Sequence, residues 1–121
     1  MSAQPRKILV GYDGTDSSVR ALDRAIQLTG YGSTLTVVNV TNDGERPGAV
    51  LDDARRRVRS RLLTASYLQR VGEAAEQLLE VATDIGAELV VVGRRAASPA
   101  EPGTVSAAVV RRSPCDVLVV G

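Results

Sequence analysis

Two loops in the sequence combine glycines with side chains that could bind a small molecule. Residues 11–14 (GYDG) directly follow the apolar run 8–10, and residues 93–104 directly follow the apolar run 89–92. The carboxylate of Asp13 can only accept hydrogen bonds, so it suits a ribose hydroxyl or an amino group rather than a phosphate. Ligands of open α/β sheets bind beyond the carboxyl ends of strands, so these loops predict one binding crevice.

The second loop carries groups that could bind an anion. Gly103 allows close approach of the backbone, and the hydroxyls of Thr104 and Ser106 could donate to phosphate oxygens. Arg94 and Arg95 add charge-assisted donors, and a helix starting here directs N–H groups at a phosphate. Each feature also has a structural interpretation as a cap or a turn. Their coincidence on two loops that follow strands favours a site.

The apolar pattern predicts the elements that position these loops. Short apolar runs without alternation are typical of strands buried on both faces, as in parallel sheets. They occupy residues 8–10, 35–40, 89–92 and 117–120. A weaker run, 62–68, alternates and indicates a half-exposed edge strand.

Helices are expected between the strands. The first is capped by Thr15 or Asp16 and ends at Gly30 or Gly32, and the third follows Gly72 and ends at Gly86. The others are expected at residues 49–61 and 105–112. Alternating strands and helices predict a mainly parallel, doubly wound α/β sheet, and 121 residues suit one domain, 1–121.

Composition excludes several kinds of chemistry. The chain has no histidine, so it has neither a Ser-His-Asp triad nor a histidine metal ligand. Cys115 is the only cysteine, which excludes an internal disulfide and a CxxC motif, and it is expected to act as a small hydrophobic residue. Lys7 is the only lysine and precedes the first strand, so a P-loop is excluded. We assign no catalytic residue and no metal ligand.

Charge and hydropathy limit the partners. The net charge is +1, which does not favour a dedicated nucleic-acid binder, and the arginines of the run 55–61 are expected to form a solvated helix face near Asp52 and Asp53. No apolar run approaches the length of a membrane span, and residues 1–7 have no signal-peptide core. We therefore expect a cytoplasmic protein without a membrane partner.

Several segments of the chain match the pattern of a known family. They are KILVGYDG at residues 7–14, LTVVNV at 35–40 and IGAELVVVG at 85–93. The most specific match is GTVS at 103–106 followed by RRSPCDVLVV at 111–120. Through these segments the chain resembles the universal stress protein family over nearly its whole length. The resemblance implies a five-stranded parallel sheet in the order 3-2-1-4-5 with helices on both faces.

The resemblance also implies an adenine-nucleotide site between the first and fourth strands. Nucleotide-binding members hold adenine and ribose near the positions of Asp13 and Val40, and the phosphates in a loop of the form G-x-x-G-x9-G-[ST]. Mg²⁺ is expected only with a bound nucleotide. Together with the loop chemistry, this assigns ligand binding to Tyr12, Asp13, Val40, Gly93, Arg95, Gly103, Thr104, Val105 and Ser106.

The phosphate loop departs from the family pattern in two ways. Ala96 occupies the position of the second glycine, and the stretch from Gly93 to Gly103 is three residues shorter. AMP or ADP is therefore as consistent with the sequence as ATP. The alternatives are a dimeric scaffold that binds no nucleotide, and a slow ATP hydrolase or autophosphorylating protein. Catalysis ranks below binding, because Asp13 is the only carboxylate placed in the crevice.

The last apolar run, Val117–Val120, would form an edge of the sheet. An uncovered apolar edge invites pairing with another strand. Members of the family commonly dimerise through this strand, so we expect a homodimer.

Overall fold

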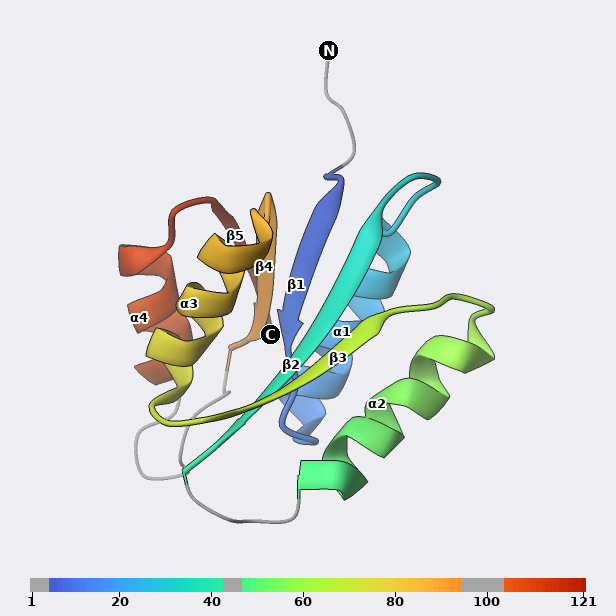
Figure 1. The fold of residues 1–121 in the computed structure, drawn as a ribbon, viewed down its shortest axis with the longest axis horizontal. Helices are drawn as coiled ribbons and strands as arrows, with labels where there is room; N and C mark the ends of the chain where they lie inside the picture. The colour runs from blue at the N-terminus through green and yellow to red at the C-terminus, as the bar shows by residue number, and fades with distance from the viewer. Residues whose placement is uncertain (1–4, 43–46, 95–103) are drawn as a thin grey trace.

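A computed structural model describes residues 5–42, 47–94 and 104–121 of the chain. In these residues five parallel strands form one sheet in the order β3-β2-β1-β4-β5, with four helices packed on it (Figure 1). The elements are β1 (Lys7–Gly11), α1 (Asp16–Leu28), β2 (Thr34–Thr41), α2 (Pro47–Ser60), β3 (Ser66–Val71), α3 (Ala74–Ile85), β4 (Leu89–Gly93), α4 (Thr104–Arg112) and β5 (Asp116–Val120). The expected α/β class and strand order are confirmed.

The two faces of the sheet bury separate aliphatic cores. Ile8, Val10 and Val37 face helices α1 and α2, which add Leu22 and Val58. On the other face, alternate strand residues pack against α3 and α4, which lie side by side (Figure 1). Side chains alternate along a strand, so a run such as Ile8-Leu9-Val10 supplies both cores.

Register in the sheet aligns the ends of the central strands. Val10 pairs with Val37 of β2 and with Val91 of β4, and the backbone N–H of Tyr12 donates to the Val38 carbonyl at 2.9 Å. The strands are parallel, so β1, β2 and β4 all finish on the same side of the sheet, at their carboxyl ends. The loops with candidate site residues begin there.

Helix α1 starts as expected and ends differently. Thr15 is its N-cap and accepts a hydrogen bond from the Ser18 N–H, whereas Thr29 rather than Gly30 or Gly32 caps its end. The Thr29 hydroxyl donates to the Ala25 carbonyl at 2.7 Å and satisfies one of the last helical carbonyls. Helix α3 does end at Gly86 in the left-handed conformation, as predicted.

The predicted position of the edge strand, residues 62–68, is wrong, because β3 spans Ser66–Val71. Leu62 has φ +59 and closes the end of α2, and the N–H of Leu63 donates to the Val58 carbonyl at 3.3 Å. Leu63 and Ala65 pack on the core from this turn and so imitate the alternation of a strand. β3 does form an edge, as expected.

Helix α2 has the solvated arginine face that the sequence predicts. Its arginines are exposed, and Arg55 pairs with Asp52 while Arg56 and Arg57 pair with Asp53. Exposed helical ion pairs of this kind each contribute a few tenths of a kcal/mol, roughly 0.3–0.5.

In the described segments, every helix is too short or too polar to cross a bilayer.

Candidate functional site

A pocket of about 60 Å³ opens at the edge where β1, β2 and β4 end. Its lining combines the loop after β1 with strand and helix residues from both sides: Gly11, Tyr12, Asp13, Val38, Val40, Ala74, Leu78, Val92 and Val105. The walls are aliphatic, and Asp13 contributes the one carboxylate among these residues. An apolar cleft with a single polar anchor suits a planar, partly polar group.

Hydrogen bonds hold the Asp13 carboxylate at the rim. Its Oδ1 accepts from the Thr15 N–H at 3.0 Å and from the Thr15 hydroxyl at 2.6 Å. The Asp13 N–H donates to the buried Ser18 hydroxyl at 3.2 Å, and Gly14 makes the turn with φ +84. Within the described residues Oδ2 makes no hydrogen bond, so this exposed oxygen can accept one from a ligand.

Tyr12 contributes to the site in a way that the sequence did not indicate. Its side chain is 2% exposed and packs in the core shared with α1 and α2. The phenol donates a hydrogen bond to the Asp53 carboxylate on α2, and the Tyr12 carbonyl accepts one from Asn39 Nδ2 at 2.8 Å. The tyrosine ring is therefore an anchor for the loop, because its hydroxyl is engaged on the side of α2.

The pKa values of Tyr12 and Asp53 shift in opposite directions. Burial, together with the Asp53 carboxylate, raises the pKa of Tyr12 to about 12. The hydrogen bonds from Tyr12 and then Arg57 lower the pKa of Asp53 below its usual value. Tyr12 therefore remains the donor and Asp53 the acceptor across the neutral range.

The pKa of Tyr12 predicts an alkaline loss of stability. The unfolded chain releases the tyrosine proton near pH 10.0, whereas the folded chain keeps it to about pH 12. The stabilisation is therefore complete below pH 10 and is lost as the pH rises toward 12. Urea unfolding should show that Tyr12→Phe loses less stability over this range than the wild type, while Tyr31→Phe, at a fully exposed tyrosine, matches the wild type. Equal losses in all three proteins would contradict this assignment.

Asn39 is a site residue that sequence reasoning missed. It is 2% exposed in β2, and its Oδ1 has no partner within the described residues. The sequence does carry a signal for Asn39, namely an amide side chain inside the buried run 35–40, because buried amides need hydrogen-bond partners. Its amide holds the Tyr12 carbonyl in place.

Gly93 lies at the end of β4 and contacts helix α1. A Cβ at this position would lie 2.3 Å from Ser17 Oγ and 2.7 Å from the Ser17 carbonyl carbon. The missing side chain therefore lets the first turn of α1 approach β4. This contact gives Gly93 a packing role that is separate from the pocket lining.

The remaining predicted residues fall into three groups. Val40 and Val105 line the pocket beside Asp13. Thr104 is exposed in the first turn of α4, and the hydroxyl of the buried Ser106 donates to the Arg94 carbonyl at 3.3 Å. Arg95 and Gly103 lie outside the described residues, as does Ala96.

Sequence reasoning also missed several lining residues. Val38 lies two positions before Val40, so strand periodicity places both on one face. Leu78 belongs to the apolar stripe of α3, which looks like ordinary core in the sequence. Only the packing of α3 over the strand ends brings it into the pocket.

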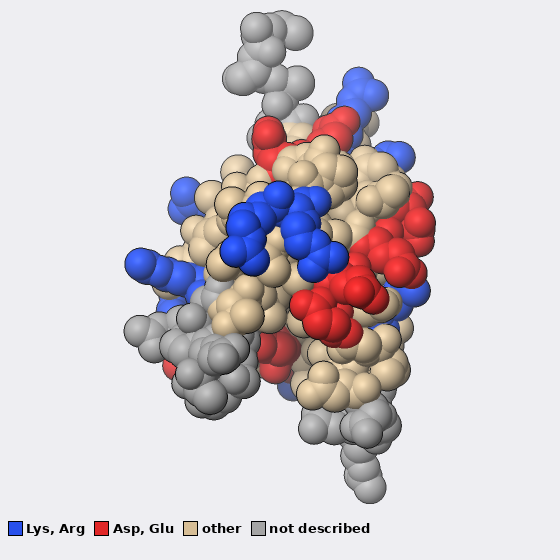
Figure 2. All heavy atoms as spheres, turned by 90° about the vertical axis from the view of Figure 1, so that its left-hand side faces the viewer, with Lys and Arg blue, Asp and Glu red and all other residues tan. Residues whose placement is uncertain are grey.

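Acidic and basic side chains lie close together on the side formed by α3 and α4. Helix α3 exposes Glu80 and Asp84, both within 3.6 Å of Arg70, and α4 ends with Arg111 and Arg112. Figure 2 looks onto this side and shows acidic and basic groups next to each other. Such a mixed surface does not favour a polyanion.

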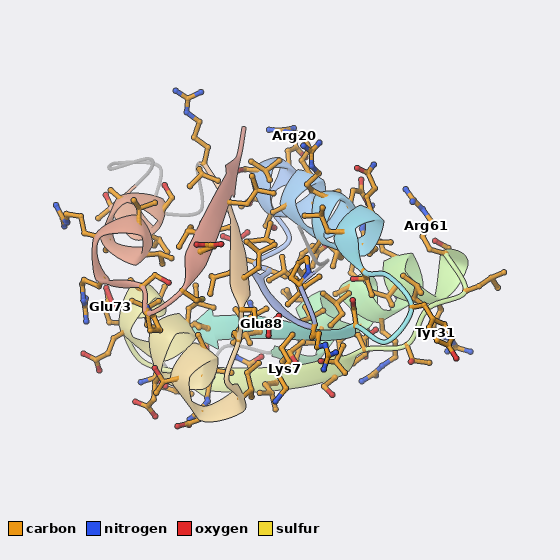
Figure 3. The ribbon with its side chains drawn as sticks, turned by 90° about the horizontal axis from the view of Figure 1, so that it is seen from above. Lys7, Arg20, Tyr31, Arg61, Glu73 and Glu88 are labelled. Atoms are coloured by element: carbon orange, nitrogen blue, oxygen red, sulfur yellow. The ribbon has the colours of Figure 1, made fainter. Side chains whose placement is uncertain are left out.

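The start of the sheet lies away from the pocket. Lys7 begins β1 and Glu88 directly precedes β4, both at the end of these strands opposite the pocket (Figure 3). The Glu88 N–H donates to the Lys7 carbonyl at 2.8 Å. The described residues contain no group of three or more carboxylate, cysteine or histidine side chains that could hold a metal ion.

Comparisons with known proteins agree with this architecture. The profile of the Universal stress protein family matches residues 5–121. Universal stress protein Rv1636 of Mycobacterium tuberculosis is 30% identical, with 95% of each chain covered. Universal stress protein YxiE of Bacillus subtilis is 28% identical over 94% of this chain and 97% of its own. The Rv1636 alignment spans 139 positions, so that relative carries segments absent from this chain of 121 residues.

Solved structures give the same result. A universal stress protein crystallised with cAMP has a TM-score of 0.84 and 31% identity, with 98% of both chains covered. An Arabidopsis thaliana universal stress family protein with AMP bound has a TM-score of 0.73 at 16% identity, over 96% of this chain and 91% of its own, which shows a shared fold. With a family profile that spans almost all of its residues, this chain belongs to the universal stress protein family.

Proposed function

We propose that this stress-response protein binds an adenine nucleotide in the pocket at the ends of β1, β2 and β4. The observation that carries the proposal is the combination of aliphatic walls with one fixed carboxylate whose Oδ2 faces no partner in the described residues. The similar protein crystallised with cAMP supports an adenine nucleotide as the ligand class.

Different residues would contact the base, the ribose and the phosphates of the nucleotide. Val38, Val40 and Leu78 would contact the base through dispersion and removal of apolar surface from water. Asp13 would accept a hydrogen bond from a ribose hydroxyl or an amino group. Thr104, in the first turn of α4, would lie on the phosphate side, where helix N–H groups favour an anion. We assign Arg95, Gly103 and Ser106 to the same side, and Mg²⁺ to a nucleotide already bound.

Calorimetry on dialysed protein tests this function. ATP, ADP, AMP and cAMP should be titrated separately, with and without Mg²⁺, and at least one should bind with saturation. No binding at a ligand concentration on the order of 1 mM would contradict the proposal and favour a scaffold without a nucleotide. Release of phosphate from ATP above a protein-free blank would instead support a slow hydrolase.

We also propose that the chain forms a homodimer through β5. This strand is an edge of the sheet, with Val119 37% exposed and Val117, Leu118 and Val120 half-buried. Its outer backbone groups offer a template for a second strand. Pairing between two copies would cover these groups and the apolar side chains together.

A lysine at the edge tests the dimer. Val119→Lys places a charge on β5 and should shift sedimentation toward the monomer, because pairing would bury that charge. Val71→Lys is the matched control, since Val71 is 58% exposed on β3, the opposite edge. A dimer that persists in Val119→Lys, or is lost only in Val71→Lys, would rule out the β5 interface.

A further inference from the structure

The loop that carries Asp13 is tied to a helix that does not line the pocket. Tyr12 precedes Asp13, and its backbone is fixed on both sides by β2: its N–H donates to the Val38 carbonyl at 2.9 Å and its carbonyl accepts from Asn39 Nδ2 at 2.8 Å. Its side chain crosses the core to Asp53 on α2. One residue therefore connects the pocket rim, β2 and α2.

Asp53 holds the other end of this connection at the surface. Its Oδ2 accepts from the Tyr12 hydroxyl and from Arg57 Nε at 3.1 Å, and its Oδ1 accepts from Arg56 at 3.2 Å. The carboxylate is about one-third exposed, so it lies where the buried phenol meets the arginine face of α2. Next to it, Asp52 pairs only with Arg55 within the described residues.

We propose that Asp53 is a positioning residue for the pocket, which acts through the Tyr12 hydroxyl to couple helix α2 to the loop that carries Asp13. The coupling follows because Tyr12 contacts Asp53 through its hydroxyl and directly precedes Asp13 in the chain. Displacement of the Tyr12 ring moves the peptide that joins Tyr12 to Asp13, and that peptide is part of the network of Thr15 and Ser18. Coupling is reciprocal, so a ligand at Asp13 would also stabilise the contact between Tyr12 and Asp53.

The inference rests on the proposed nucleotide function for its effect on affinity, but the coupling itself can be measured without a ligand. The amides of Tyr12, Asp13 and Thr15 donate hydrogen bonds to Val38, Ser18 and Asp13, and so report the order of the loop by hydrogen exchange. Asp53→Ala and Tyr12→Phe each remove the link between α2 and the loop. Each should speed exchange at these amides by about tenfold and weaken AMP binding by about threefold to tenfold.

Three further variants distinguish coupling from a general loss of stability. Asp53→Asn keeps an oxygen that accepts from Tyr12 but removes the charge next to the arginines, so it should restore exchange and affinity to within about twofold of the wild type. The double variant Tyr12→Phe/Asp53→Ala should match either single one, because both remove the same interaction. Asp52→Ala is the control on the same helix and should leave loop exchange unchanged.

The outcomes separate this inference from the function on which it builds. Unchanged loop exchange in Asp53→Ala, additive effects in the double variant, or an Asn variant as defective as Ala would overturn the coupling. Failure of the wild type to bind any of ATP, ADP, AMP and cAMP would overturn the nucleotide function only. The exchange rates of the ligand-free variants would still decide whether α2 positions the loop.

Discussion

Replacing Gly93 by alanine is expected to destabilise the fold by about 3 kcal/mol, the upper end of the range seen when a packed core is forced to accept extra atoms. The added Cβ would lie 2.3 Å from Ser17 Oγ and 2.7–2.8 Å from the backbone carbonyl of Ser17. Contacts this short with backbone cannot be relieved by rotating a side chain. Helix α1 would have to move away from β4 and pull its own Leu22 and Ile26 out of the core.

Gly48→Ala is the matched control for this change. Gly48 lies in α2, and a Cβ added there would have no tertiary neighbour within 4 Å, so alanine should leave stability unchanged or raise it slightly. Denaturant unfolding of both variants measures the difference. A Gly93→Ala protein within about 0.5 kcal/mol of the wild type would show that α1 adapts easily. If that variant lost only nucleotide affinity, Gly93 would belong to the ligand site rather than to the packing.

The second large effect is expected at Asp13. Asp13→Ala should weaken nucleotide binding by about tenfold or more, because it removes a charged acceptor that would contact the ligand. It also removes the acceptor for two hydrogen bonds from Thr15, so a loss of affinity alone would not separate ligand contact from loop order. A second variant is needed.

Asp13→Asn makes that separation. An amide oxygen can still accept from Thr15, while the amide nitrogen in place of the second oxygen can only donate. If Asp13 contacts the nucleotide, the Asn variant keeps the turn and loses affinity as the Ala variant does. Asp16→Asn, a change of an exposed carboxylate in the first turn of α1, should bind as the wild type does. Full affinity in Asp13→Asn would mean that Asp13 only shapes the loop.

Much of the fold could be predicted because local patterns and tertiary packing agree. The run Ile8-Leu9-Val10 forms a strand and is fully buried on both faces, so its lack of alternation reflects the final environment. Leu63 and Ala65 show where this logic fails. They alternate like strand residues but belong to the turn after α2, where Leu62 takes a left-handed conformation that sequence pattern does not indicate.

The site was predicted in part for similar reasons. Asp13, Val40 and Val105 line the pocket, because ends of parallel strands meet at one edge whatever the details of packing. The partner of Tyr12 could not be predicted, since Asp53 is 41 positions away and looks like one more charge on a solvated helix. Leu78 likewise enters the pocket only through the angle at which α3 crosses the sheet. Long-range side-chain pairs of this kind are set by packing rather than by local pattern.

A nuclear magnetic resonance titration of the isotope-labelled protein with AMP tests the central claim most directly, because it reports both binding and place. We expect saturable shifts at the backbone amides that surround the pocket: Gly11, Asp13, Val38, Val40 and Val105. Smaller shifts at Asp53 would follow from its link to Tyr12. The absence of shifts with AMP and also with ATP, ADP and cAMP, or shifts confined to the exposed arginines of α2, would contradict nucleotide binding in this pocket.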